Sequence, residues 1–115
     1  KAGAAAEAAA AGKTWGMEDL VAKGEEVYKK NCAACHQVNG QGLPPTFPGI
    51  AGSAVATGDI AAHIDISVNG RPGTAMAAYK GLLNDADMAA VITYERNAWG
   101  NSASVVQPSA VKAAR

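Results

Sequence analysis

Two cysteines and a histidine lie together in the pentapeptide Cys32-Ala33-Ala34-Cys35-His36 and could form covalent and metal bonds. The pattern C-x-x-C-H is the attachment signature for c-type haem. At the end of a helix, two thiols at this spacing can reach the two vinyl groups of neighbouring pyrrole rings and form thioethers. The next residue then offers an imidazole nitrogen to the iron. We therefore predict one covalent haem c, bonded to Cys32 and Cys35, with His36 as an iron ligand.

Three other interpretations of the cysteine pair have less support. A thioredoxin-like dithiol needs a βαβ context, and the sequence shows no strand pattern. A zinc site needs four ligands, and His63 is the only further candidate. A disulfide between Cys32 and Cys35 would close a loop too short to remove much entropy from the unfolded chain.

The second axial ligand has three sulfur candidates, because the chain contains Met17, Met76 and Met88. Electron-transfer haems often pair histidine with methionine, which raises the reduction potential. Met76 lies in the loop 71–79, where a thioether can be turned inward, and we expect it to bind the iron. A methionine that only fills a gap in this loop is the alternative. Met17 is expected to pack as a hydrophobic staple residue, and Met88 to lie in the core.

His63 could also be the distal ligand. It is surrounded by alanines and isoleucines, with Asp59 and Asp65 close in sequence. We expect it to be a half-exposed histidine on a helix.

The elements that must position these residues are predicted to be helices and loops. Apolar residues at three- and four-residue spacing predict a helix over 18–31. A second helix is expected over 59–68 and a third over 85–99, with Asn84 as N-cap and Asp87 as its capping partner. The glycine- and proline-rich segments 32–53 and 71–83 are predicted to be loops. No strand is expected.

The chain of 115 residues is expected to form one domain over residues 16–100. Residues 1–15 are alanine-rich and predict a linker or tether, and residues 101–115 predict a C-terminal tail outside the core. A core of this size is marginal, and only 5% of the residues are aromatic. A haem would supply buried apolar surface. No apolar stretch of about 18 residues is present, so no membrane span is expected. Because the chain starts at Lys1, we expect a processed or excised piece of something longer.

The charges balance to a formal net charge of zero, which argues against nucleic acid as a partner. They are unevenly placed, since residues 31–58 carry no charge and residues 66–84 carry only Arg71 and Lys80. We expect an apolar, weakly positive rim around the cofactor, suited to transient docking.

From Met17 to Trp99 the sequence resembles class I cytochrome c. The resemblance rests on the C-x-x-C-H pentapeptide, the Gly40-x-Gly42-x-Pro44-Pro45 loop, the Pro72-Gly73-x-x-Met76 loop and a last helix with Tyr94. It implies a small all-α fold of three to five helices around one haem. It also implies that the first and last helices cross, where Gly24 and Tyr28 would meet Val91 and Tyr94.

The same resemblance implies a proline carbonyl that accepts a hydrogen bond from the second ring nitrogen of His36. Pro45 is the expected residue, with Pro44 as the alternative. We also expect Tyr79, at the end of the Met76 loop, to contact the haem.

A narrower resemblance joins Pro72-Gly73-Thr74-Ala75-Met76 and the segment 89–101 to the cytochrome domain of subunit II of caa-type oxidases. It implies an electron carrier that relays single electrons to the binuclear copper domain of that subunit. The donor would be a cytochrome or a quinol-oxidising complex, and the parent enzyme a cytochrome c oxidase. The location would be the periplasmic face of a bacterial inner membrane.

Three alternatives remain open. The chain could be a freely diffusing periplasmic cytochrome c or the haem domain of a dehydrogenase. It could also be an enzyme or sensor whose sixth ligand leaves.

Overall fold

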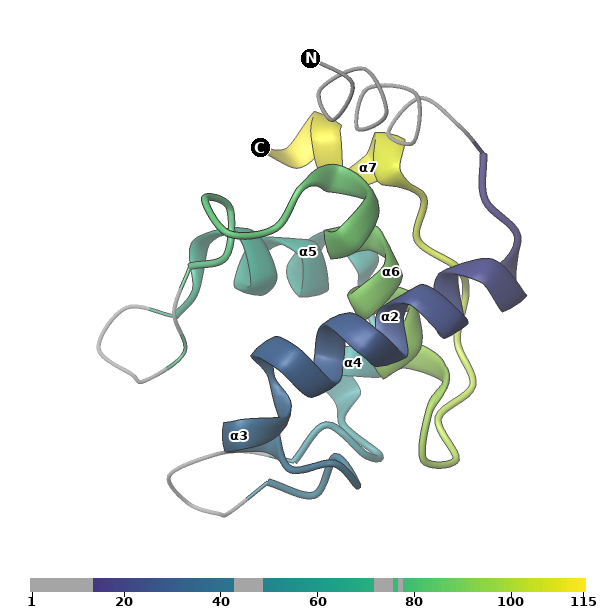
Figure 1. Cartoon of the computed structure of the whole chain (residues 1–115), viewed down its shortest axis with the longest axis vertical. Helices are drawn as coiled ribbons and strands as arrows, with labels where there is room; N and C mark the ends of the chain where they lie inside the picture. The colour runs from purple at the N-terminus through teal and green to yellow at the C-terminus, as the bar shows by residue number, and fades with distance from the viewer. Residues whose placement is uncertain (1–13, 43–48, 72–75, 77) are drawn as a thin grey trace.

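The structure, a computed structural model, describes residues 14–42, 49–71, 76 and 78–115. All regular structure in these ranges is helical, which confirms the all-α class (Figure 1). None of the described helices is both long and apolar enough to cross a bilayer. The helices are α2 (Met17–Asn31), α3 (Ala33–His36), α4 (Ala54–Thr57), α5 (Ile60–Asn69), α6 (Asp85–Asn97) and α7 (Pro108–Ala114).

Four of the described helices have seven or more residues, within the expected three to five, and α3 and α4 add single turns of four residues each. α3 lies inside the segment 32–53 that was predicted to be a loop. Backbone hydrogen bonds alone can form one turn in such a segment, and no side-chain periodicity announces it.

The longer helices begin close to their predicted positions. The side chain of Asn84 accepts a hydrogen bond from the backbone N–H of Asp87 at 2.8 Å, which confirms the predicted N-cap of α6. α6 ends at Asn97 rather than Trp99, because Ala98 is extended with a ψ of 164° and Trp99 has a φ of 55°, and neither conformation continues a right-handed helix.

α2 and α6 cross in the largest helix–helix contact of the described chain (Figure 1). A Cβ placed on Gly24 would lie 2.0 Å from the carbonyl oxygen of Ala90 and 2.7 Å from the Cβ of Tyr94. Only glycine therefore allows the two backbones to approach this closely. The expected meeting of Gly24 with Tyr94 is confirmed, and Ala90 is the residue whose backbone lies at the crossing.

The C-terminal segment joins the core, contrary to the expectation that 101–115 would remain outside it. Val106 and Val111 are fully buried, and α7 packs against α6 and α5 (Figure 1). The hydroxyl of Thr93 accepts from the N–H of Val106 at 3.0 Å and donates to its carbonyl at 3.2 Å. The reason is that α6 is apolar on several faces and needs cover beyond α2.

The two methionines outside the predicted ligand loop differ. Met88 is fully buried, which confirms its place in the core. Met17 is 38% exposed and is the first residue of α2, so the expectation of a staple contact was wrong.

Candidate functional site

The cysteines and the histidine lie at the junction between α2 and α3. Cys32 is the C-cap that follows α2, and its N–H donates to the carbonyl of Tyr28 at 2.8 Å. The N–H of His36 donates to the carbonyl of Cys32 at 2.9 Å and closes the single turn of α3. Both cysteines and His36 are half-buried, and the two thiols are not joined in a disulfide. The fold therefore presents two free thiols and an imidazole from one helical turn.

The loop that follows His36 is anchored to the helix crossing by two aromatic side chains. The hydroxyl of Tyr28 donates to the carbonyl of Gln37 at 2.6 Å, and the indole N–H of Trp99 donates to the carbonyl of Val38 at 2.9 Å. A Cβ on Gly40 would lie 2.4 Å from the Trp99 ring, so the backbone there rests directly on the indole. These contacts fix the chain immediately after the histidine.

The anchoring side chains belong to one aromatic cluster. The ring centroids of Tyr28 and Tyr94 are 5.5 Å apart, those of Tyr28 and Trp99 5.1 Å, and those of Tyr94 and Trp99 5.4 Å. Such separations are typical of favourable aromatic pairs. The α2–α6 crossing and the loop after His36 thus share one packed support.

The second loop approaches the same place. Met76 is half-buried, and its backbone carbonyl accepts a hydrogen bond from the N–H of Arg71 at 3.1 Å. The hydroxyl of Tyr79 donates to the carbonyl of Asn31 at 3.0 Å, one residue before the first cysteine. The N–H of Tyr79 donates to the carbonyl of Ser67 at 3.0 Å, which ties the loop to α5.

Pro45, whose carbonyl was predicted to accept a hydrogen bond from His36, and its alternative Pro44 lie outside the described residues. Their hydrogen bond to His36 stays a prediction, as does contact of Tyr79 with a haem.

Burial makes the site unfavourable to negative charge. Burial raises the pKa of the Cys32 thiol to about 12, and the nearby Glu95 and Cys35 contribute to this rise. Burial also raises the pKa values of the Tyr28 and Tyr79 hydroxyls. Cys32 is therefore a neutral thiol at neutral pH.

The donor set fits a covalent haem better than a bare metal ion. Within the described ranges no group of three or more His, Cys, Asp or Glu side chains could hold a metal. That finding gives no support to the zinc interpretation, which needs four ligands. Two thiols at C-x-x-C spacing and an adjacent imidazole match instead what thioether attachment and one axial bond require.

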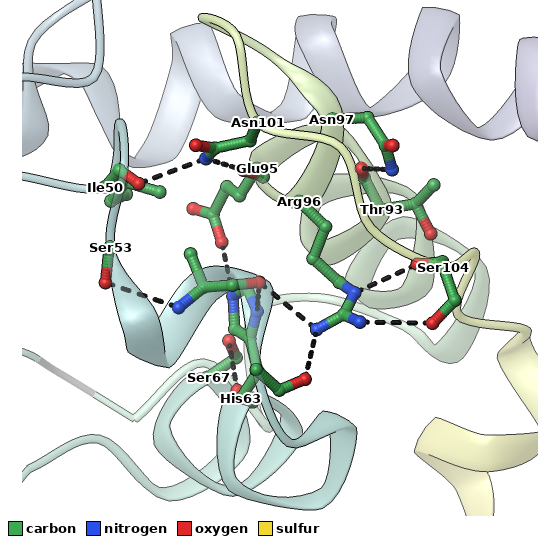
Figure 2. Close-up of polar contacts among 12 residues, drawn as sticks. Ile50, Ser53, His63, Ser67, Thr93, Glu95, Arg96, Asn97, Asn101 and Ser104 are labelled. Atoms are coloured by element: carbon green, nitrogen blue, oxygen red, sulfur yellow. Dashed lines mark hydrogen bonds and ion pairs between the residues drawn. The ribbon is translucent and has the colours of Figure 1, made fainter.

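Sequence reasoning missed a buried polar network that includes His63, Glu95 and Arg96 (Figure 2). His63 is 4% exposed, so the expectation of a half-exposed histidine was wrong. Its Nδ1 lies 3.1 Å from the carbonyl oxygen of Ala56, and its Nε2 lies 2.8 Å from Oε1 of Glu95. A signal was present, since His63 shares a helical stripe with the buried residues Ile64, Ser67 and Val68.

Arg96 extends this network and is 3% exposed. Its guanidinium donates to the carbonyls of Ala56 and Gly58, both at 3.1 Å, and to the backbone carbonyl and hydroxyl of Ser104. Asn101 donates to the carbonyls of Ile50 and Glu95 at 3.1 and 2.9 Å (Figure 2). The network therefore joins α4, α5, α6 and the C-terminal segment.

Comparisons with known proteins point to one family. The model of the family described as Cytochrome c matches residues 21–99. The chain is 37% identical over 90 residues to the cytochrome c subunit of alcohol dehydrogenase (quinone) of Gluconobacter oxydans strain 621H, covering 70% of this chain and 19% of that protein. It is 36% identical over 87 residues to the cbb3-type cytochrome c oxidase subunit CcoP of Azospirillum brasilense, covering 68% and 28%.

Cytochrome c-552 of Thermus thermophilus is 31% identical over 106 residues, covering 78% of this chain and 69% of that protein. The chain thus spans about a fifth of the dehydrogenase subunit and most of the smaller cytochrome. None of these three relatives is named as an oxidase subunit II.

Proposed function

This chain belongs to the cytochrome c family and carries a covalent haem c with iron, and from that premise we propose which of its residues hold the haem. Cys32 and Cys35 would form the thioethers, and His36 and Met76 would bind the iron. The single observation that carries this proposal is the α3 turn, which presents two free thiols and the imidazole together. Contact between His36 and Met76 supports the second iron ligand.

Electron transfer is the activity of this family, and the haem iron supplies one reversible electron when bound. If both His36 and Met76 bind the iron, no position would remain on it for a substrate, so electron exchange is the chemistry that the bound haem would supply. Tyr28 and Trp99 would hold the loop after His36 still, because both donate to its backbone. These two bonds would keep the backbone beside His36 in the same position in both oxidation states.

The ligand assignment is tested by two methionine variants. Met76→Ala should lower the reduction potential and abolish the near-infrared sulfur–iron band of the oxidised protein. Met88→Ala removes a methionine from the core and should cost about 2–5 kcal/mol of stability while the band remains. Loss of the band in Met88→Ala alone would show that the sulfur ligand was assigned to the wrong methionine.

As its place in respiration, we propose that the domain relays electrons from a donor cytochrome or quinol-oxidising complex to the copper centre of an oxidase subunit II. The support is the resemblance of the Met76 loop and of segment 89–101. A linker would hold haem and copper at high effective concentration. Thioether attachment of haem takes place outside the cytoplasm, which favours the periplasmic side of a bacterial membrane.

A second candidate is a haem domain of a dehydrogenase complex. The observation that favours it is 37% identity to a cytochrome c subunit of alcohol dehydrogenase (quinone). The coding sequence upstream of Lys1 separates the candidates. A copper-binding domain there would favour the oxidase, further C-x-x-C-H motifs or a quinone-linked domain would favour the dehydrogenase, and a bare signal peptide would favour a diffusing cytochrome.

A further inference from the structure

The His63–Glu95 pair is buried in an arrangement that requires a shared proton (Figure 2). The ring Nδ1 faces the carbonyl oxygen of Ala56, which can only accept, so Nδ1 carries a hydrogen. The ring Nε2 faces a carboxylate oxygen at 2.8 Å, so a second proton must lie between them. With both protons the pair is neutral, whichever partner holds the second one. Loss of that proton leaves a lone pair against a carboxylate and a net negative charge.

A change of charge at this place would act strongly on its surroundings. His63 is 4% and Glu95 7% exposed, and charges in so dry a region are poorly screened. Arg96 on α6 contributes a buried positive charge, bonded to the same Ala56 carbonyl as His63. A positive charge here favours the negatively charged form of the pair over the neutral form.

The neighbouring helices α4, α5 and α7 place no further buried charge beside the pair. α4 carries no charged residue in its sequence Ala-Val-Ala-Thr. On α5 and α7 the remaining charged side chains are exposed. Glu95 also interacts electrostatically with the side chains of Tyr28 on α2, Cys32 after its end and Tyr79 in the second loop.

The position of Glu95 connects the pair to the proposed haem site. Glu95 follows Tyr94, which packs in the cluster that anchors the loop after His36. The negative charge of Glu95 also contributes to raising the pKa of Cys32, the first attachment residue. A change of charge on the Glu95 carboxylate therefore changes the electrostatic potential at the Cys32 sulfur, which would be bonded to the porphyrin.

We infer that the His63–Glu95 pair is a proton-binding site coupled to the redox state of the haem. This inference rests on the haem site proposed above. When one electron arrives from the donor protein, the positive charge at the iron falls by one, and the pair binds one proton from solvent. When the electron leaves to the acceptor, the pair releases that proton. Reduction thus raises the proton affinity of the pair, because a positive charge nearby has been lost.

The test is redox titration of the holoprotein with small mediators between about pH 5 and pH 8. In the wild type the potential should fall as pH rises, by up to about 59 mV per pH unit, which is the value of a tenfold change for a one-electron couple. In Glu95→Gln the amide can donate to Nε2 of His63, so the hydrogen bonds persist without a titrating proton. This variant should lose most of the slope.

The matched control is Glu25→Gln, which makes the same chemical change at an exposed residue paired with Lys29 at 3.4 Å. In Glu25→Gln the slope of reduction potential against pH should equal that of the wild type. The contributions of the other titrating groups are the same in the wild type and in both variants. A second measurement uses the wild type alone: reduction in weakly buffered solution with a pH indicator should show proton uptake.

Equal slopes in the wild type and Glu95→Gln would overturn the inference. So would a wild-type potential that is independent of pH, with no proton taken up on reduction. A preparation without covalent haem, or without a reversible one-electron couple, would overturn the proposed function as well. A haem spectrum and one redox titration at a single pH identify such a preparation before the pH series.

Discussion

The hydroxyl of Tyr79 donates a hydrogen bond of 3.0 Å to the carbonyl of Asn31, across 48 positions of sequence. Asn31 is the last residue of α2 and precedes Cys32, whereas Tyr79 follows Met76 by three residues. The bond therefore links the loop with the proposed sulfur ligand to the helix end with the proposed attachment site. Removal of the bond should loosen the sulfur ligand before it disturbs the thioethers.

Tyr79→Phe tests this link. One lost hydrogen bond should lower the free energy of unfolding by about 1 kcal/mol. The near-infrared sulfur–iron band should also disappear at lower denaturant concentration than in the wild type. Tyr94→Phe removes a hydroxyl from α6 and serves as the control, with the band retained to the wild-type concentration. Identical loss of the band in both variants would contradict a specific role for Tyr79.

Gly24→Ala should disrupt the helix crossing. Its methyl group would meet the backbone of Ala90, which cannot move aside as a side-chain end could. We expect a loss of more than about 2 kcal/mol, measured by denaturant unfolding. In Gly81→Ala the added Cβ meets no atom within 4 Å, so that variant should unfold near the wild-type midpoint. Equal midpoints for the two variants would refute the close approach of α2 and α6.

Stability should fall at alkaline pH because of Tyr28. Burial raises the pKa of its hydroxyl above the ordinary value of 10.0, so the folded chain keeps a proton that the unfolded chain releases. The stabilisation is present below about pH 10 and is lost as pH rises further. Tyr28→Phe should be less stable at neutral pH, since the bond to Gln37 is lost, but should show a shallower alkaline decline. Denaturant unfolding at a series of pH values measures the free energy of unfolding of both proteins. An equal alkaline decline in the wild type and Tyr28→Phe would show that Tyr28 is not the group responsible.

Cys35→Ala should leave a single thioether. The remaining bond at Cys32 would keep any matured haem attached after acid–acetone extraction, and the pyridine haemochrome spectrum should show one unreacted vinyl group. Ala34→Ser changes an exposed neighbour in the same turn and should keep the two-thioether spectrum. A two-thioether spectrum from Cys35→Ala would show that Cys35 is not an attachment residue.

Local patterns predicted the helices well. Leu20, Gly24 and Tyr28 recur at four-residue spacing and form the buried face of α2, and Asn84 caps α6. Such features depend on residues within one or two turns of each other, so the sequence carries them directly. The single turn α3 has no such pattern, whereas α4 begins at the N-cap Ser53, whose hydroxyl accepts from the N–H of Ala56. The packing of Val106 and Val111 depends on α6 rather than on their own neighbours.

The sequence by itself determined the chemistry that this protein can do, because the two thiols and the imidazole of residues 32–36 are adjacent in the chain. Tertiary structure alone decided how that pentapeptide is held and what surrounds it. Tyr79 reaches Asn31, Trp99 reaches Val38 and Glu95 reaches His63 across 48, 61 and 32 positions. The physical reason is that hydrogen bonds and burial act on distance in space, and only the folded backbone brings these residues together.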